Sequence, residues 1–326
     1  MVISSRIRLA RDLTSYSFPG RLGPEEKKAV RELIEGVLAP AALIHVHMES
    51  LPENDRKCLV EKHLISDQLA QKGSGKSVCI SKDEAVSVMI NEEDHIRVQA
   101  MSAGYSLRQA YKQAMDICVL LEQALPIAYS EKYGFLTACP TNTGTGLRAS
   151  VMAHLPALVV TGRIKALVDG LTKSGFAVRG YMGEHSKPSG NIFQISNQVT
   201  LGISEADLLQ GFTRVVDNVL QAERQLRRKI YEESPDKLED SVYRSFGELV
   251  YARTISEEEA LQRISDIRFG LSLGFFKEAD EMSIVQITNQ IGAAVLSREK
   301  GSSLTTKEED AYRAQKIREI LKGEKR

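Results

Sequence analysis

The strongest constraint on the fold is the alternation of apolar and polar side chains at the start of the chain, in "VISSRIRL" (2–9). Successive side chains of a strand point to opposite faces, so this spacing places Ile3, Ile7 and Leu9 on one face and Arg6 and Arg8 on the other. The stretch therefore predicts a strand of a half-buried sheet, from which two guanidinium groups point the same way.

Strand and helix patterns then follow one another along the chain. Strand-like stretches are "SVCI", "AVSVMIN", "HIRVQAM", "FAVRGYM" and "NIFQISNQVTL". Helical spacing covers 24–38, 106–124 and 204–232, and another helix is expected to begin near Leu147. Strand patterns end at "EESPDK" (232–237). We therefore expect an α+β fold, with a largely antiparallel sheet flanked by helices in a first domain (1–231) and a smaller C-terminal helical domain (238–326).

One stretch, "QKGSGKSVCIS" (71–81), contains Gly-Ser-Gly-Lys-Ser, which is the end of a phosphate-binding loop. The full loop needs Gly-x4-Gly-Lys-Ser/Thr between a strand and a helix. Here Ala70 stands at the first glycine position, and the residues after Lys76 alternate as a strand does. A turn is expected at this point, and the nucleotide site is expected elsewhere.

Bulk composition excludes several classes of protein. Lys and Arg number 43 and Asp and Glu also number 43, so no overall field attracts nucleic acid or an anionic membrane, and an anion site must be a local cluster. The four cysteines, Cys58, Cys79, Cys118 and Cys139, have no Cys-x-x-Cys spacing, which predicts neither disulfides nor a metal site. Apolar runs are shorter than the roughly 20 residues that span a bilayer, and the charged start is unlike a secretory signal, so a soluble cytoplasmic protein is expected.

Arginines recur where strands end or turns begin. Arg97 follows the acids of "NEEDHIR", Arg148 follows the glycine-rich "CPTNTGTG", and Arg179 precedes a turn-rich connection. Together with Arg6 and Arg8 they suit a triphosphate, because a guanidinium keeps its proton and bonds phosphate oxygens in pairs. The glycines of the loop and the dipole of the helix expected from Leu147 would face the same anion.

Carboxylates accompany two of these arginines, in the acidic "NEED" (91–94) and at Glu184. Carboxylates in these positions suit a guanidino group as the acceptor of a phosphoryl group. Such a group needs assistance, because it is a poor nucleophile with delocalised lone pairs. Two of them would hold the outer nitrogens in line with a γ-phosphate and take up the proton as the N–P bond forms.

Four motifs, "SSRIRLAR", "NEEDHIR", "CPTNTGTGLRAS" and "RGYMGE", occur in an order and spacing that resemble the catalytic domain of phosphagen (guanidino) kinases over residues 2–231. Within that family, "VEKHLIS", "GLRASVMAHLPALV" and the helical tail resemble bacterial protein arginine kinases. The resemblance implies that Glu93 is the catalytic carboxylate, that Glu184 is its partner, and that Cys139 matches a reactive cysteine. It implies ATP contacts at Ser4, Ser5, Arg6, Ile7, Arg8, His63, Arg97, Arg148, Ala149, Ser150, Val151, Met152, Arg179, Gly180, Tyr181, Met182, Gly183 and Glu184, with His63 against the base.

Two features depart from the small-molecule members of the family, and a third departs from the bacterial protein arginine kinases. Met152 stands where these relatives often place a histidine, and its thioether is expected to pack on adenine. The helical domain that precedes the Arg-x-Arg strand in these relatives has no counterpart here, which favours an acceptor arginine on a protein surface. The tail matches a phosphoarginine-binding motif at Asp310 and Arg313, but Glu309 replaces its first arginine, and a carboxylate there repels phosphate.

The resemblance implies transfer of the γ-phosphoryl group of ATP to arginine side chains in proteins, as a mark for Clp-type degradation under stress. Mg²⁺ is implied by ATP chemistry, without a dedicated metal cage. Expected partners are proteins with exposed arginines, an activator protein, a Clp-type protease complex and a second copy of the chain. The alternatives are a small-molecule guanidino kinase and a regulator that binds phosphoarginine without catalysis.

Overall fold

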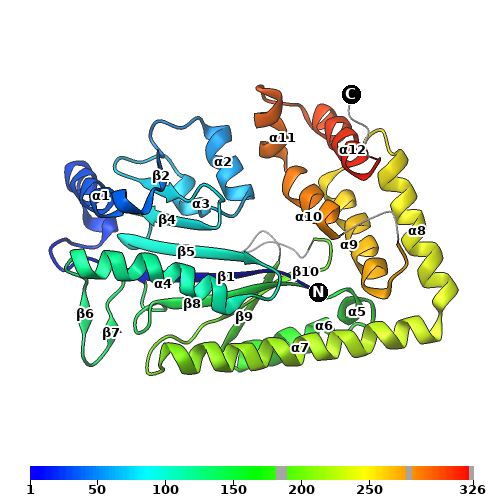
Figure 1. The fold of residues 1–326 in the computed structure, drawn as a ribbon, viewed down its shortest axis with the longest axis horizontal. Coiled ribbons are helices and arrows are strands. Elements are labelled where there is room, and N and C mark those ends of the chain that lie inside the picture. Colours follow the sequence, from blue (N-terminus) through cyan, green and yellow to red (C-terminus); the bar gives the residue numbers. More distant parts are fainter. Residues whose placement is uncertain (181–188, 277–280, 323–326) are drawn as a thin grey trace.

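The computed structural model describes residues 1–180, 189–276 and 281–322. Its centre is an eight-stranded sheet in the order β2-β3-β4-β5-β1-β8-β10-β9, in which each neighbouring pair is antiparallel (Figure 1). These strands are β1 (Val2–Arg11), β2 (Ile44–His47), β3 (Ser77–Ile80), β4 (Val86–Ile90), β5 (Ile96–Ala103), β8 (Leu147–His154), β9 (Phe176–Gly180) and β10 (Ile192–Asn197). The short strands β6 (Tyr129–Ser130) and β7 (Gly134–Phe135) form a separate pair. The predicted α+β fold with an antiparallel sheet is confirmed.

Helices lie on both sides of the sheet and form the C-terminal part of the chain. They are η1 (Pro19–Arg21), α1 (Pro24–Leu38), η2 (Ala39–Ala41), α2 (Glu53–Glu61), α3 (Asp67–Ala70), α4 (Leu107–Ala124), α5 (Pro156–Val160), α6 (Ile164–Lys173), α7 (Glu205–Glu233), α8 (Pro235–Tyr251), α9 (Glu257–Leu273), α10 (Glu281–Gln290), α11 (Ala293–Lys300) and α12 (Thr306–Lys322). The helices predicted at 24–38, 106–124 and 204–232 are confirmed, as is the helical tail. No helix in the described ranges is long and apolar enough to cross a membrane.

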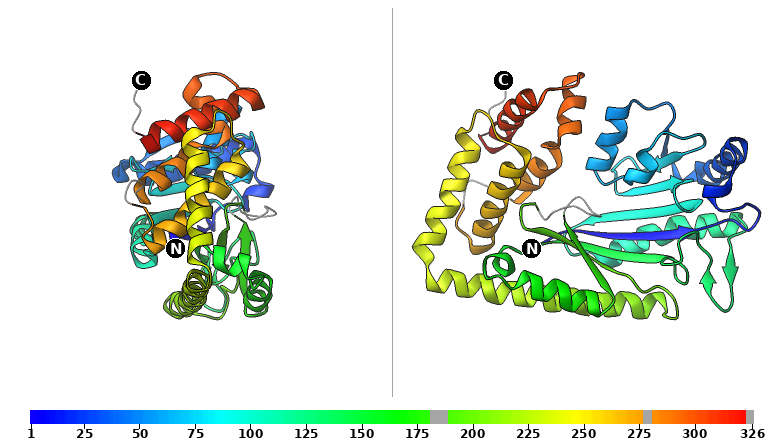
Figure 2. Two further views of the ribbon diagram at one scale, coloured as in Figure 1. Left: turned by 90° about the vertical axis from the view of Figure 1, so that its right-hand side faces the viewer. Right: turned by 180° about the vertical axis from the view of Figure 1, so that it is seen from behind.

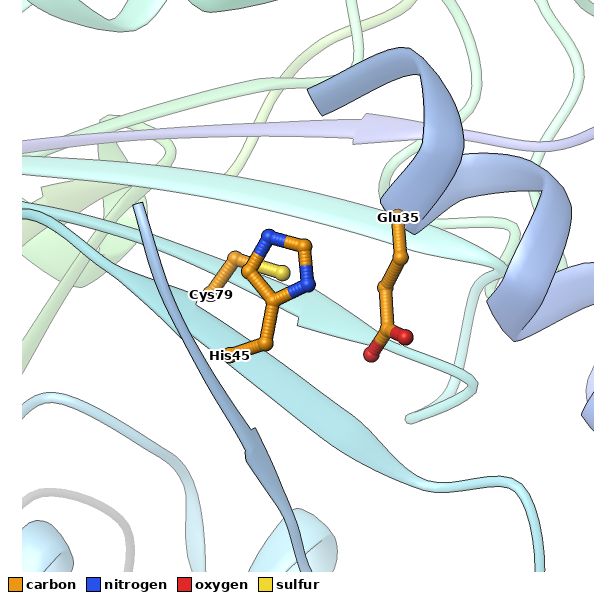
Figure 3. A group of neighbouring side chains, drawn as sticks. All are labelled: Glu35, His45 and Cys79. Atoms are coloured by element: carbon orange, nitrogen blue, oxygen red, sulfur yellow. The ribbon is translucent and has the colours of Figure 1, made fainter. Parts of the chain in front are cut away.

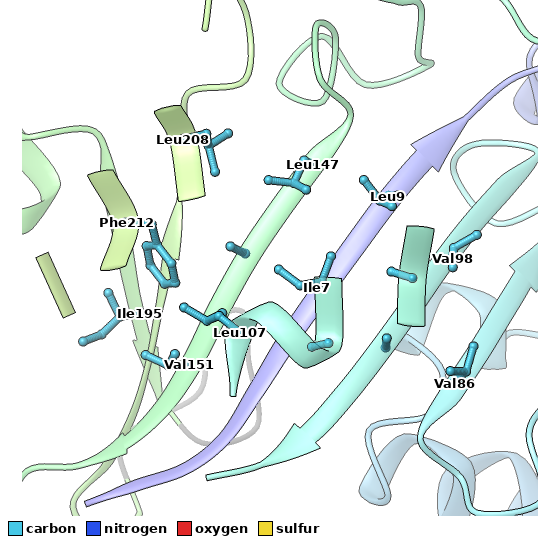
Figure 4. Packing of buried hydrophobic residues seen from close by; sticks show 14 of the residues in the cluster. Ile7, Leu9, Val86, Val98, Leu107, Leu147, Val151, Ile195, Leu208 and Phe212 are labelled. Carbon is cyan, nitrogen blue, oxygen red and sulfur yellow. The ribbon is translucent and has the colours of Figure 1, made fainter. Parts of the chain in front are cut away.

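One face of the sheet is apolar, as the alternation in β1 predicts. Ile7 and Leu9 are fully buried, and they pack in one cluster with side chains of α4 and α7, among them Leu107 and Phe212 (Figure 4). Ile3 is an exception, because the register of β1 against β8 shifts between Val2 and Ser4. As a result Ile3 packs against Met152 on the opposite face.

The helix expected from Leu147 is wrong, because these residues form the central strand β8. Leu147, Ala149 and Val151 are buried in the apolar cluster, and the residues between them face the other way. This repeat of two residues is that of a strand. The preceding loop closes tightly: at Gly146 (φ 64°) a Cβ would lie 2.6 Å from the Ala10 carbonyl oxygen. The glycine is needed for this close approach, and the helix dipole expected from Leu147 is not part of the site.

The predicted turn at residues 71–76 is followed by a strand and not by a helix, since β3 begins at Ser77. The Lys76 ammonium group donates hydrogen bonds to the carbonyl oxygens of Gln68 (2.8 Å) and Gln71 (3.4 Å). Lys76 therefore stabilises the turn that precedes it. The strand expected after this turn is confirmed.

The C-terminal helices have an apolar cluster of their own, formed by residues of α8, α9, α10 and α12 with neighbouring connections. They meet the sheet-bearing part where α11 docks on α2 (Figure 2). There the Glu61 carboxylate accepts hydrogen bonds from the backbone N–H groups of Ala294 and Val295, both at 2.9 Å. A side chain of α2 thus caps the first turn of α11.

Candidate active site

The second face of the sheet gathers arginines from four strands. Arg6 and Arg8 lie on β1, Arg97 on β5, Arg148 on β8 and Arg179 on β9, and all five line one pocket of about 480 Å³. Strand register causes this convergence, because residues paired across antiparallel strands share a face. Arg8 pairs directly with Arg148, Ala10 with Arg97, and Gln194 with Arg179. The structure thus brings together the five arginines named from the sequence, and their binding of ATP stays a prediction.

The two arginines of β1 are held in an environment that disfavours their charge. Burial, with the nearby Arg148 and Arg97, lowers the pKa of Arg6 to about 10, and it lowers the pKa of Arg8 well below its ordinary value. Nε and Nη2 of Arg8 are buried without a hydrogen-bond partner in the described part of the chain. Buried cations without acceptors are costly, so this pocket is built for an anion that supplies the missing acceptors.

Arg97 differs from its neighbours because two carboxylates hold it. Nη1 lies 2.6 Å from Oε2 of Glu92, and Nη2 lies 3.0 Å from Oε2 of Glu93. The Glu92 side chain is 1% exposed and also accepts a hydrogen bond from the Ser66 hydroxyl group, whereas the Glu93 side chain is 35% exposed at the pocket wall. Glu93 is therefore the carboxylate that an acceptor molecule can reach, and Glu92 is a buried anchor for Arg97.

His63 borders this pocket and a second one of about 970 Å³, which reaches the C-terminal helices. Its backbone has φ of 58°, and its carbonyl oxygen accepts a 2.7 Å hydrogen bond from the Gln99 amide. Burial, then the charge of Arg6, lowers the pKa of His63 to about 4, so the ring is neutral at physiological pH. Ser4 and Met152 line the second pocket beside it. A neutral imidazole and a thioether suit the flat face of a base.

The loop that carries Cys139 forms a further wall. Cys139 and Asn142 line the arginine pocket, and the buried Asp94 carboxylate accepts hydrogen bonds from the Ala138 N–H group (2.7 Å) and the Asn142 amide (3.4 Å). Burial, together with the neighbouring Asp12, raises the pKa of Asp94. Cys139 is half-buried and lines the pocket, and Asp94 holds the loop that carries it; the match to a reactive cysteine stays a prediction.

Some predicted ATP contacts point away from the pocket. Ser5, Ile7, Ala149 and Val151 alternate with the pocket residues along β1 and β8, so their side chains lie on the opposite face. Ser150 lies on the pocket face, where its hydroxyl oxygen accepts a 3.4 Å hydrogen bond from Arg6. Gly180 ends β9. Tyr181, Met182, Gly183 and Glu184 lie outside the described residues, so the partner carboxylate stays a prediction.

Asp310 and Arg313, the predicted phosphoarginine ligands, lie in α12. The Arg313 side chain is 2% exposed, with Nη1 2.6 Å from the Asp310 carboxylate and 3.0 Å from the Ile255 carbonyl oxygen. Its Nε donates to the carbonyl oxygen of Ile291 at 2.9 Å. In this structure the pair joins α12 to neighbouring segments, and phosphoarginine binding by it stays a prediction.

Two residues of the site were missed in the sequence. Gln194 accepts a 2.8 Å hydrogen bond from Arg6, and Glu92 anchors Arg97. The alternation of "NIFQISN" places Gln194 among buried apolar neighbours, which was an available signal. Nothing in three consecutive acids distinguishes the buried Glu92 from the accessible Glu93, because that depends on how the turn folds back.

The chain is similar to known proteins over nearly its whole length. The profile of the ATP:guanido phosphotransferase C-terminal catalytic domain matches residues 26–226, and that of the protein-arginine kinase McsB C-terminal domain matches residues 235–326. A protein-arginine kinase of Halothermothrix orenii is 42% identical over 98% of this chain and 93% of that protein. Another, of Halalkalibacterium halodurans, is 43% identical over 99% of this chain and 92% of that protein.

Solved structures agree with the sequence relatives. The duplicated taurocyamine kinase of Schistosoma mansoni with bound transition-state analogue components superposes with a TM-score of 0.63 at 28% identity, covering 74% of this chain and 37% of that longer one. Lombricine kinase, at 23% identity and a TM-score of 0.62 over 70% of this chain and 67% of that one, shares the fold. With family profiles and near full-length relatives in accord with the arginine pocket, the chain belongs to the phosphagen kinase family of ATP:guanido phosphotransferases, among its protein-arginine kinases.

Proposed function

We propose that this protein phosphorylates arginine side chains of other proteins with ATP. The observation that carries the proposal is the convergence of five arginines on one pocket with the accessible carboxylate of Glu93 at its wall. Phosphoryl transfer is catalysed by alignment and by neutralising the phosphate charge, and rigid strands supply both here. The relatives named protein-arginine kinase cover nearly all of the chain, which favours an arginine in a protein over free arginine.

The reaction follows from the placement of the groups. The arginines hold the triphosphate, while His63 and Met152 take the base in the adjoining pocket. Glu93 holds a nitrogen of the acceptor guanidinium and removes its proton as the nitrogen bonds to the γ-phosphorus. The bond from that phosphorus to the bridging oxygen breaks, and ADP leaves. Glu184 is proposed as the second carboxylate on the acceptor.

A magnesium ion is proposed to enter with ATP and to neutralise part of the phosphate charge. The pocket offers the carboxylates of Glu92, Glu93 and Asp67, and oxygen ligands are those that magnesium prefers. Glu92 is already engaged by Arg97 and Ser66, so the protein contributes few direct ligands. This is typical of magnesium bound mainly through phosphates and water.

We further propose the cellular setting that the family resemblance implies. The chain would act in the cytoplasm, with a catalytic domain at 1–231 and a helical domain at 238–326. It would work as a homo-oligomer, respond to stress with an activator protein, and mark proteins for a Clp-type protease.

The test is a kinase assay of the full chain with Mg-ATP and, separately, a model protein or free arginine. Mass spectrometry at neutral pH reads the acid-labile phosphoarginine. We expect phosphoarginine on the protein and none on free arginine. Glu93→Gln should keep the fold and ATP binding but lose transfer. Phosphorylation of free arginine alone would indicate a metabolite kinase, and transfer by Glu93→Gln at the wild-type rate would remove Glu93 from the chemistry.

A further inference from the structure

Three potential metal ligands meet at the edge of the sheet, remote from the arginine pocket. Glu35 of α1, His45 of β2 and Cys79 of β3 point toward one another (Figure 3), and their ligand atoms all lie within 4.8 Å of each other. Among the described residues this is the only such group of three. Small rotations of the side chains would bring the atoms to distances of about 2.0–2.3 Å from a shared zinc ion.

The fold itself creates this meeting. β2 is the edge strand, and its register against β3 places His45 directly opposite Cys79. Side chains paired in this way share a face of the sheet. Glu35 reaches the same face from α1, where its side chain is 13% exposed. The three residues are separated in sequence by 9 and 33 intervening positions, which no short metal motif spans.

The ligand atoms of Cys79 and His45 are available. No hydrogen bond within the described chain occupies the Cys79 thiol or the His45 ring. Cys79 is fully buried, and burial, with the charge of Glu35, raises the pKa of its thiol to about 12. A divalent cation reverses this preference, because a coordinating thiol gives up its proton. One thiolate and one carboxylate would then balance a charge of +2, and His45, which is exposed, offers the route of entry.

The carboxylate is already oriented. The Ser77 hydroxyl group donates a 2.8 Å hydrogen bond to Glu35 Oε1, and Nε2 of His47 lies 3.2 Å from the same oxygen. Hydrogen bonds from outside the ligand set commonly fix metal-binding carboxylates. His47 lies two positions after His45 on the same face of β2, so the edge strand supplies both a ligand and a support.

We propose that Glu35, His45 and Cys79 bind one divalent cation of the zinc class, with His47 and Ser77 orienting the carboxylate. Thiolate, imidazole and carboxylate together select zinc or a similar borderline metal over magnesium or calcium. On binding, the thiol proton passes to solvent and the sulfur–metal bond forms. The bound ion links α1, β2 and β3, and its coordination by His45 attaches the short edge strand to the core.

The test uses the untagged, reduced, full-length protein and Co²⁺ as a spectroscopic probe for zinc. A thiolate ligand gives an ultraviolet charge-transfer band. We expect one Co²⁺ per chain, displaced by Zn²⁺, with no such band in Cys79→Ala. His45→Ala, at an exposed position, should bind at least about tenfold more weakly. Cys118→Ala is the matched control, because burial raises the pKa of Cys118 also to about 12 without a histidine beside it, and it should behave as wild type.

Thermal unfolding gives a second readout. Zn²⁺ should raise the unfolding midpoint of the wild type and of Cys118→Ala, and should raise that of His45→Ala less. A charge-transfer band that persists in Cys79→Ala would place the thiolate elsewhere, for example at Cys139, and would overturn the proposal. Absence of the band in the wild type, or an equal zinc effect on the midpoint of His45→Ala, would overturn it as well.

Discussion

Arg6→Met should stabilise the nucleotide-free protein while weakening its binding of ATP. Burial, and then the charges of the neighbouring arginines, lower the pKa of Arg6 from 12.5 to about 10. A shift of this size corresponds to roughly 3 kcal/mol of destabilisation of the charged form, at about 1.4 kcal/mol per pKa unit. Loss of the hydrogen bonds to Gln194 (2.8 Å) and Ser150 (3.4 Å) costs about 1 kcal/mol each. The net expectation is a gain of about 1 kcal/mol in the free energy of unfolding.

Arg97→Met is the matched comparison from the same pocket, with the opposite sign. Arg97 is 2.6 Å from Glu92, whose side chain is 1% exposed. Removing one partner of a buried ion pair leaves an uncompensated charge, and this costs about 3–5 kcal/mol. Both variants should lose ATP affinity, so only stability without nucleotide separates a repelled arginine from a paired one.

The assay is urea unfolding followed by circular dichroism, because the chain contains no tryptophan for fluorescence. Wild type and both variants are compared with and without Mg-ATP. The midpoint of Arg6→Met should lie above that of the wild type without nucleotide and should respond less to ATP. A midpoint of Arg6→Met well below the wild type, or equal losses in both variants, would refute the idea that burying the charge of Arg6 among other arginines destabilises the empty pocket.

Three further predictions concern other parts of the molecule. Arg148→Ala should slow phosphoryl transfer on the order of 10²-fold, as loss of one preorganised charge stabiliser does, and an unchanged rate in steady-state kinetics would remove it from the site. Glu61→Gln replaces a carboxylate that accepts from two N–H groups by an amide with only one oxygen, so amide hydrogen exchange should accelerate in α11 and stay constant in α4. The same exchange rate of α11 in the variant and the wild type would contradict the capping role of Glu61. The pKa of His63 is lowered to about 4, so the folded state resists protonation of this ring, and stability is lost as pH falls from about 6.5 through 4. His63→Asn should therefore show a smaller decline of the denaturation midpoint over this pH range. The same decline in the variant and the wild type would argue against this role of His63.

Alternation was the most informative part of the sequence. It placed Ile7 and Arg8 on opposite faces of β1, and the structure has the first in the core and the second in the pocket. The same signal was overlooked in "LRASVMAH", where the glycine-rich loop suggested a helix start and the strand period was the better guide. Sequence alone therefore located the arginines but not the geometry of the loop before Arg148.

Contacts between distant segments could not be predicted from local pattern. His45 and Cys79 meet through the register of two strands, and spacing rules for metal sites do not cover this. The burial of Glu92 beside Arg97 likewise depends on Ser66 approaching from another segment. Such features follow from packing, which a periodicity does not encode.

The cap of α11 by Glu61 connects two parts of the molecule thermodynamically. Glu61 ends α2, two residues before His63, and both residues line the larger pocket together with Val295 of α11. Docking of the C-terminal helices and the position of the His63 loop are therefore not independent variables. A ligand that favours one position of this loop favours one position of α11 by the same factor, because coupling between two equilibria is reciprocal. With His63 against the nucleotide as proposed, we expect docking of the helical tail to change nucleotide affinity, and nucleotide to change docking of the tail by the same factor.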